Sequence, residues 1–243
     1  MTEFDKSQWV KHEFAQEYRD SADVYIVERK RMLEILKSFY RHFVGNKPNS
    51  HILDLGCGDG IVTYELLKND NSIEATLIDG SDDMLSKAKD RLKDFRNVHF
   101  IRASFQEILK TDSILQRYDF IVSSLAIHHL TMEEKTALFR IVYSHLNFNG
   151  CFLNVDVILA PSDALEQWYL LLWNQWIDER RSLLGLEGNQ YDDIIRRYKD
   201  NTDNRPDTLD TQIKALQTIG FENVDCFYKY GIFTIYGGKK IKG

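Results

Sequence analysis

Apolar and polar residues follow two different periods along this chain of 243 residues, and these periods predict its secondary structure. Between residues 7 and 44, apolar side chains recur three and four positions apart, which indicates helices, and residues 45–49 end them. Beyond that point, short apolar runs typical of buried strands alternate with helical segments. The expected strands are 51–55, 73–78, 98–101, 119–125 and 151–159. This alternation predicts right-handed βαβ units around a parallel sheet.

The alternation stops after residue 161 and returns near the C-terminus. Residues 162–204 have a helical pattern, and a further helix is expected over 210–218. Two β-rich runs, 223–228 and 232–236, are too close together for a crossover helix and are therefore expected to pair antiparallel. We predict an α/β fold: a Rossmann-like, doubly wound, mostly parallel seven-stranded sheet with a C-terminal antiparallel hairpin, N-terminal helices and a helical insert before the last helix. The expected organisation is a single domain, 1–243, with a helical cover at 1–45, a core at 50–160 and 208–238, and the insert at 162–204.

Composition and charge narrow the classes of function. The chain is 43% hydrophobic and 28% charged, with a net charge of −6, which argues against a broad nucleic-acid surface. Its three cysteines lie far apart, as expected for reduced thiols, and no cysteine or histidine shows metal-ligand spacing. The N-terminal residues mix charges throughout, and the longest apolar run is about a third of a membrane span. We expect a cytoplasmic protein that binds neither a metal nor a membrane.

The stretch HILDLGCGDGIVTYELLK, residues 51–68, places a glycine-rich turn between a strand and a helix. Glycines at such a turn let the backbone approach a ligand closely. A phosphate-binding P-loop is excluded because no lysine follows the glycines. A dinucleotide fingerprint is also excluded, because Ile61 stands at its third glycine and because Asp54 and Asp59 would repel a pyrophosphate.

A cationic ligand reverses this argument about charge. S-adenosylmethionine carries a sulfonium and an ammonium group, so Asp54 at the end of the first strand would attract it. Asp79, at the end of the second strand, can accept hydrogen bonds from both ribose hydroxyls. Ligands of open parallel sheets bind at this carboxyl edge. The alternative is that both acids merely cap turns, which leaves the density of glycines unexplained.

The motifs together resemble the class I S-adenosylmethionine-dependent methyltransferases, over roughly residues 50–160 and 208–238. ILDLGCGDG is similar to their first motif, and residues 77–81 and 101–106 are similar to their ribose-binding and adenine-binding segments. YDFIVSSLAIHHL and LNFNGCFLNVDV resemble the fourth-strand motif and the approach to the fifth strand. The helical insert also resembles the carboxy-S-adenosylmethionine synthases of tRNA modification and small-molecule methyltransferases near them.

The resemblance implies a set of residues that bind the cofactor S-adenosyl-L-methionine: Tyr18, Asp54, Gly56, Cys57, Gly58, Asp79, Gly80, Met84, Ser104, Phe105 and Leu125. The first-motif residues would hold the methionine moiety, and Asp79 would hold the ribose. Ser104 stands where the family often has an acid that bonds the adenine amine, and Phe105 would pack on the adenine ring. Leu125 would lie at the sulfonium end, with Tyr18 over the cofactor.

Methyl transfer needs a general base only when the acceptor must lose a proton. His128 and His129 follow the fourth strand and are the candidate catalytic residues, although such a pair can also consist of one packed and one solvated ring. Asp156 is expected to point toward the same edge. The predicted function is methyl transfer to a small-molecule acceptor. One alternative is a cofactor-modifying enzyme similar to carboxy-S-adenosylmethionine synthases, for which Arg196 and Arg197 would supply the cation. The other is a cofactor-binding protein without catalysis.

A stripe of apolar residues marks the insert: Leu165, Trp168, Tyr169, Leu172, Trp173 and Trp176. This spacing places them on one side of a helix, so the stripe is expected to be buried. The N-terminal helices carry the other aromatic surface without an obvious partner. We expect these two segments to meet as a cover over the cofactor that forms the acceptor chamber, and we expect a homodimer contact through the same region.

Overall fold

The computed structural model describes residues 4, 7–111, 114, 116–188 and 191–241. Within them, one sheet has the strand order β3-β2-β1-β4-β5-β7-β6. The strands are β1 (His51–Leu55), β2 (Glu74–Asp79), β3 (Val98–Arg102), β4 (Tyr118–Ser124), β5 (Leu146–Val157), β6 (Glu222–Tyr230) and β7 (Phe233–Lys239). Strands β1 to β5 pair in parallel, whereas β7 runs antiparallel to both β5 and β6. The predicted seven-stranded α/β sheet with its C-terminal hairpin is confirmed.

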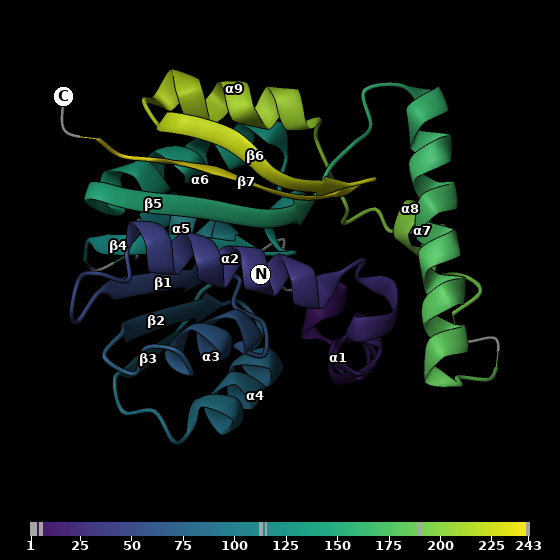
Figure 1. Ribbon diagram of the computed structural model, residues 1–243, viewed down its shortest axis with the longest axis horizontal. Coiled ribbons are helices and arrows are strands. Elements are labelled where there is room, and N and C mark those ends of the chain that lie inside the picture. The colour runs from purple at the N-terminus through teal and green to yellow at the C-terminus, as the bar shows by residue number, and fades with distance from the viewer. Residues whose placement is uncertain (1–3, 5–6, 112–113, 115, 189–190, 242–243) are drawn as a thin grey trace.

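Helices cover both faces of this sheet and make it the middle of three layers (Figure 1). One face carries α2 (Arg29–Phe43), α3 (Ile61–Leu67) and α4 (Asp82–Leu92), whose apolar residues share one core cluster. The other face carries α5 (Phe105–Thr111), α6 (Met132–His145) and α9 (Leu209–Ile219), which share a second cluster. Both faces of the parallel strands are therefore buried, which explains their nearly continuous apolar sequence.

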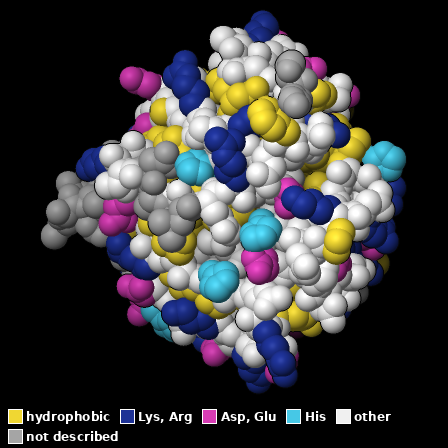
Figure 2. Space-filling model, turned by 90° about the vertical axis from the view of Figure 1, so that its left-hand side faces the viewer, with side chains coloured by type: hydrophobic (Ala, Val, Ile, Leu, Met, Phe, Trp, Pro, Cys, Tyr) yellow, Lys and Arg dark blue, Asp and Glu magenta, His cyan; other side chains and the backbone are white. Residues whose placement is uncertain are grey.

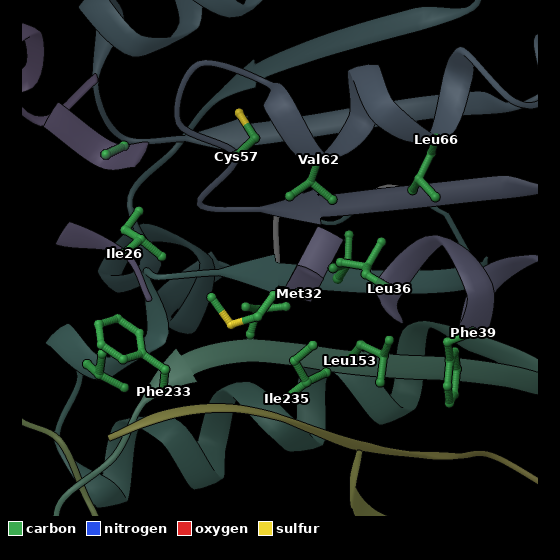
Figure 3. Packing of buried hydrophobic residues seen from close by; sticks show 14 of the residues in the cluster. Ile26, Met32, Leu36, Phe39, Cys57, Val62, Leu66, Leu153, Phe233 and Ile235 are labelled. Carbon is green, nitrogen blue, oxygen red and sulfur yellow. The ribbon is translucent and has the colours of Figure 1, made fainter. Parts of the chain in front are cut away.

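The larger core cluster fixes α2 against the strands. Met32 and Leu36 lie one helical turn apart and point toward Leu153 of β5 and Ile235 of β7 (Figure 3). All four side chains are almost completely buried. Because a four-residue spacing keeps side chains on one side of a helix, the periodicity in the sequence had already indicated this face of α2.

The remaining helical segments gather at one end of the sheet. They are the short turn η2 (Gln8–Val10), α1 (His12–Tyr25), η3 (Ile127–His129), α7 (Asp163–Leu184) and α8 (Ile194–Asp200). Figure 1 shows α1 and α7 beyond the end of the strands from which the chain leaves β5. This is the carboxyl edge of the parallel strands, where ligands of such sheets bind.

Hydrogen bonds from side chains of α7 to backbone carbonyl oxygens of α1 join the insert to the N-terminal helix. The indole nitrogen of Trp173 donates to the carbonyl oxygen of Tyr25 at 2.6 Å, and that of Trp176 donates to Val24 at 3.2 Å. The N-terminal segment and the insert, which are about 150 positions apart in the sequence, are therefore in direct contact.

These contacts set the rotation of α7 and correct one prediction about it. Its buried residues are Tyr169, Trp173 and Ile177, at a regular four-residue spacing. Leu165 and Trp168, in contrast, are 37% and 53% exposed. The prediction that one buried stripe begins at Leu165 is therefore wrong at these two positions. Leu165 lies in the first turn of α7, and Trp168 faces away from the side that buries its neighbour Tyr169.

The strand β5 also begins earlier than expected. Leu146 already pairs with Tyr118 of β4, and the amide of Asn149 donates to the carbonyl oxygen of Lys240 at 2.6 Å. The turn at 149–150, which indicated a strand starting at Cys151, is therefore incorporated in the sheet. Pairing with neighbouring strands overrides the local turn preference here.

Figure 2 shows the end of the molecule opposite α7. Lys and Arg side chains are interspersed there with Asp, Glu and His, and no broad patch of one sign covers this face. Within the described residues, every helix is too short or too polar to cross a membrane.

Candidate active site

The glycine-rich turn after β1 needs glycine for two different reasons. Gly56 has φ +65°, and a Cβ added to it would lie 2.5 Å from the Cβ of Ala126. Gly58 has φ +52°, but a Cβ there would meet no atom within 4 Å. Gly56 is therefore required for packing, whereas Gly58 exposes bare backbone to open space. Such a cradle suits a ligand that lies directly on the main chain.

Asp79 connects this turn to the next strand. Its carboxylate accepts hydrogen bonds from the backbone N–H groups of Gly58 at 2.9 Å and of Ser81 at 2.8 Å. Burial raises the pKa of Asp79, and these N–H donors oppose the rise. A carboxylate has about four acceptor positions, so two remain for a ligand.

Asp54 lies deeper than Asp79. It is 1% exposed, and one of its oxygens accepts a hydrogen bond from the hydroxyl of Thr63 at 2.7 Å. Its other oxygen, Oδ1, is buried and has no hydrogen-bond partner in the part of the chain that the structure describes. Asp54 is not among the residues that line the cavities beside it. Its charge therefore acts on a ligand through the wall of the site.

Two adjoining cavities, of about 140 and 60 Å³, follow the glycine turn, and we call them together the glycine pocket. Both are lined by Gly56, Gly58, Met84, Ser124 and Leu125. Among the other predicted residues, Asp79, Gly80, Ser104 and Phe105 line the larger cavity, and Cys57 lines the smaller one. Tyr18 belongs to α1, but its side chain lies outside the described structure. The structure thus brings most of the predicted residues together at one edge.

Ser104 has a structural partner of its own. Its hydroxyl donates to Glu107 at 2.8 Å, and its backbone N–H donates to the same carboxylate at 2.7 Å. Ser104 therefore starts α5 with a local capping arrangement. Its oxygen keeps acceptor capacity toward the glycine pocket, so the adenine contact stays a prediction. Gly80 is covered by the ring of Phe4, which sequence reasoning did not identify.

Leu125 lies between the glycine pocket and a neighbouring chamber. It lines both parts of the glycine pocket and the neighbouring chamber described below. Its φ of +52° is uncommon for a residue with a branched side chain, and its N–H donates to the carbonyl oxygen of Val155 at 2.7 Å. Backbone strain of this kind often occurs at functional sites.

His129 links two distant segments. Its Nε2 accepts a hydrogen bond from the indole of Trp9 at 3.0 Å, which requires Nδ1 to carry the proton and to donate to the carbonyl oxygen of Asp203 at 3.1 Å. Burial, and then the neighbouring His128, hold the pKa of His129 well below its usual value. Both nitrogens of this neutral ring are occupied. This arrangement does not fit the expected role of His129 as a base and makes it a connector instead.

His128, unlike His129, uses only one of its ring nitrogens in a hydrogen bond to a described residue. Its Nδ1 lies 2.6 Å from Oδ1 of Asp156, and its backbone N–H donates to Oδ2 of the same carboxylate at 2.9 Å. Asp156 is almost completely buried in β5. The carboxylate orients the imidazole and favours a proton on Nδ1, which leaves Nε2 as the basic nitrogen. This pair has the geometry of a general base held by an orienting acid.

A larger cavity of about 470 Å³, the aromatic chamber, lies beside the glycine pocket. Six described rings line it: Trp9, Phe14, Tyr25, Trp173, Tyr198 and Phe233. His128 also lines it, while Trp9, Leu125 and His129 line both the chamber and the glycine pocket. The chamber has the size expected of a small-molecule site.

The arginines are placed differently from the expectation. Arg196 is 66% exposed and pairs with Asp193, so it is not the cation of the site. Arg197 pairs with Glu17 and lines the aromatic chamber. Arg205 lines the larger cavity of the glycine pocket, and Arg19 and Arg29 line the smaller one. Sequence reasoning missed all three because nothing in the local pattern distinguishes them.

Lys135 holds the segment around Arg205 in place. Its buried ammonium group donates to the carbonyl oxygen of Arg205 and to the carboxylate of Asp207, each at 2.5 Å.

Within the described residues, no group of three or more His, Cys, Asp or Glu side chains could hold a metal ion.

Comparison with known proteins finds a methyltransferase domain and relatives of two kinds of enzyme. A family model described as a methyltransferase domain matches residues 52–150. A carboxy-S-adenosyl-L-methionine synthase of Helicobacter pylori (strain J99) is 26% identical over 201 residues, which cover 79% of this chain and 75% of that protein. A malonyl-[acyl-carrier protein] O-methyltransferase of Ilyobacter polytropus is 30% identical over 128 residues, covering 53% of this chain and 44% of the relative.

Solved structures agree with this fold. An O-methyltransferase family protein from Burkholderia thailandensis superposes with a TM-score of 0.69 at 12% identity, covering 98% of this chain. This chain spans 63% of the length of that protein. A magnesium protoporphyrin IX methyltransferase from Synechocystis with bound SAH has a TM-score of 0.65 at 14% identity and covers 96% of both chains. At these identities the likeness shows the fold alone.

Proposed function

Since the chain belongs to the class I S-adenosyl-L-methionine-dependent methyltransferases and uses that cofactor, we propose that it methylates a small-molecule acceptor. The acceptor binds in the aromatic chamber. The observation that carries this proposal is the junction of two cavities: Trp9, Leu125 and His129 line both the glycine pocket and the chamber. A cofactor in the first cavity and an acceptor in the second would meet at Leu125, where an in-line displacement needs them to be close.

The residues of the glycine pocket fit a cofactor with two positive charges. Gly58 leaves backbone open to the methionine moiety, and the free acceptor positions of Asp79 suit the ribose hydroxyls. The unpaired oxygen of Asp54 places negative charge behind the wall of the site, where a cation stabilises it. We propose these residues, with the other predicted lining residues, as the cofactor-binding set.

His128 is the residue that we propose as general base. It lines the chamber, and its orientation by Asp156 leaves Nε2 for the acceptor proton. His129 positions the cover rather than the acceptor, because both of its nitrogens are engaged.

We also propose a division of labour along the chain. Residues 50–160 and 208–238 bind the cofactor, while the N-terminal segment and the insert cover it. Trp9 and Asp203 both bind His129, so the two parts of the cover are joined at the edge of the site. Such a cover excludes water from the transfer step.

The test of this function is turnover. Purified protein should release S-adenosylhomocysteine only when an acceptor is added, and mass spectrometry should find one added methyl group on that acceptor. Cofactor binding without any acceptor-dependent release, across a broad panel of small molecules, would contradict methylation and favour a non-catalytic cofactor-binding protein.

A second candidate function is suggested by Arg205, which lines the glycine pocket. A carboxylated cofactor carries an added negative charge, for which an arginine is the natural partner. Several relatives from Helicobacter pylori are named as carboxy-S-adenosyl-L-methionine synthases. Mass spectrometry of the ligand that co-purifies distinguishes the two functions. A carboxylated cofactor would support the second, and the ordinary cofactor or its demethylated product would support methyl transfer.

We expect S-adenosylmethionine to bind more weakly below neutral pH. Burial raises the pKa of Asp54 from 3.8 to about 7, and the charges of Asp79 and Asp59 add to this rise. Below that pH the carboxyl group is neutral and no longer attracts the cationic cofactor. If the bound cofactor keeps Asp54 ionised, affinity falls about tenfold for each pH unit below about 7. Calorimetric titration between about pH 6 and pH 8 measures this slope.

The raised pKa of Asp54 also makes the stability of the protein without cofactor depend on pH. This dependence has the opposite sign to that of cofactor affinity. The folded-state pKa of Asp54 lies above its unfolded value of 3.8. Its contribution to stability is therefore fully present below that value and is lost as pH rises through about 7. Asp54→Asn should remove both effects and weaken binding at neutral pH. An asparagine variant that keeps the wild-type dependence of affinity on pH would exclude Asp54 as its source.

Trp9→Phe should weaken cofactor binding by a factor of about 2–12, the range expected for one lost hydrogen bond. The variant keeps an aromatic ring but removes the N–H group that donates to His129. Calorimetry with S-adenosylhomocysteine provides the measurement. Trp168→Phe, on the exposed side of α7, is the matched control. Equal affinity in both variants would show that the link to His129 does not support the pocket.

A further inference from the structure

The walls of the aromatic chamber are rings held in fixed orientations. Trp173 contacts Tyr198 and Phe233 edge-on, with centroids 5.3 and 5.4 Å apart. Trp9 and Phe14 meet in the same way at 5.1 Å. Edge-to-face packing of this kind is favourable and limits ring rotation. A cavity enclosed by rigid ring faces and edges favours a flat, unsaturated ligand over a flexible aliphatic one.

Most polar groups of these walls already have partners inside the protein. The indole of Trp9 donates to His129, and the indole of Trp173 donates to the carbonyl oxygen of Tyr25. Among the hydrogen bonds of the described residues, none involves Nε2 of His128 or the hydroxyls of Tyr198 and Ser21. All three residues line the chamber, which therefore offers a ligand one base and hydroxyl donors. Of the two hydroxyls, that of Tyr198 belongs to the aromatic wall beside Trp173.

Asp156 acts on both His128 and Tyr198. Asp156 binds His128 directly, and its charge also adds to the effect of burial that raises the pKa of the Tyr198 hydroxyl. The hydroxyl therefore stays protonated and acts as a hydrogen-bond donor at physiological pH. Tyr198 is half-buried, and its hydroxyl donates to no described residue, so a ligand that displaces water from this hydroxyl must bring an acceptor atom.

Charged side chains do not provide a site for an ionic acceptor inside the chamber. Arg197 pairs with Glu17 at 2.5 Å, and both side chains are about half exposed, so this pair belongs to the rim. Asp200, which also lines the chamber, is exposed. The buried acid Asp156 is bonded to His128. Among the described residues, the enclosed part of the chamber therefore fits an uncharged molecule.

Building on the proposed methyl transfer, we infer that the acceptor is a neutral, planar aromatic or conjugated molecule with an acidic hydroxyl and a second oxygen. The hydroxyl faces His128, and the second oxygen accepts a hydrogen bond from Tyr198. Nε2 of His128 takes the hydroxyl proton as the oxygen forms its bond to the methyl carbon. The S–C bond breaks, its electron pair stays on sulfur, and the proton leaves later to solvent. Tyr198 is a positioning residue in this step.

Binding of 7-hydroxycoumarin, a planar phenol with a carbonyl oxygen, tests the inference without turnover. Protein loaded with S-adenosylhomocysteine should bind it saturably, and the absorbance of the bound probe should shift toward the phenolate form at a lower pH than in water. His128→Gln should keep the binding but lose this spectral shift. Tyr198→Phe should weaken the binding by a factor of about 2–12 while leaving the affinity for S-adenosylhomocysteine unchanged. Tyr143→Phe, on the other face of the sheet, is the control.

Turnover with S-adenosylmethionine completes the test. A panel of matched bicyclic phenols, anilines and saturated alcohols should show methylation of the phenols, with a raised KM in Tyr198→Phe and a lowered kcat in His128→Gln. Phenols that neither bind nor react, while anilines or alcohols are methylated, would overturn the inference and leave the proposed function standing. Failure of S-adenosylmethionine itself to bind would overturn the proposed function, and the inference would fail with it.

Discussion

Replacing His128 by glutamine is expected to lower kcat by a factor of about 10²–10⁴, the usual contribution of a positioned general base. The affinity for S-adenosylmethionine should change little, because His128 lines the aromatic chamber and not the glycine pocket. Glutamine keeps a polar side chain of similar length but cannot take the acceptor proton. Steady-state kinetics, with S-adenosylhomocysteine release as the readout, gives kcat and KM separately.

Two further variants make this result interpretable. Asp156→Asn should lower kcat as well, since an amide no longer favours a proton on Nδ1 of His128. His99→Gln, at an exposed position of β3, is the matched control and should leave kcat unchanged. A glutamine variant with wild-type kcat would mean that the acceptor needs no base.

Asp79→Ala is expected to weaken S-adenosylmethionine binding by about 1.5–3 kcal/mol, roughly 10- to 150-fold, as for lost hydrogen bonds to a charged group. The carboxylate lies at the glycine pocket and has acceptor positions free for the ribose hydroxyls. It also holds the N–H groups of Gly58 and Ser81, so its removal loosens the turn on which the methionine moiety would lie. Isothermal titration calorimetry measures the change.

The structural part of this effect can be separated from the contact with the ligand. Asp79→Asn keeps one oxygen acceptor and should lose less affinity than Asp79→Ala. Asp82→Ala, an exposed position in the first turn of α4, controls for the loss of a carboxylate near the site. Unchanged affinity in a folded Asp79→Ala variant, verified by its thermal unfolding, would remove Asp79 from the cofactor-binding set.

The sheet, the glycine-rich turn after β1 and the position of Asp79 could be predicted from local sequence. Apolar runs and glycine turns report on short-range constraints, since a buried parallel strand must be apolar and a tight turn needs residues with positive φ. The turn at Gly56 and Gly58 is such a case. Asp79 could be placed beside it because the carboxyl ends of adjacent parallel strands meet at one edge, as the pairing of β1 with β2 confirms.

Local pattern was misleading where a residue's surroundings come from distant parts of the chain. His128 and His129 are neighbours of the same type, yet one is bonded to Asp156 and the other connects Trp9 to Asp203. Nothing in the dipeptide distinguishes them. The helical stripe in the insert was likewise periodic, but the packing of α7 against α1 left Leu165 and Trp168 exposed.

By itself, the sequence determined the order and type of the core elements, the glycine turn and the acids at the strand ends. These follow from backbone sterics and from apolar periodicity, which act within a few residues. Only the tertiary structure decided that Arg205 rather than Arg196 lies at the glycine pocket, and that Tyr198 belongs to the chamber. Both depend on how α8 and the segment after it pack across the sheet edge, with Lys135 holding the backbone of Arg205 from α6. Contacts between positions so far apart in the chain depend on the whole packed molecule, and no local pattern encodes them.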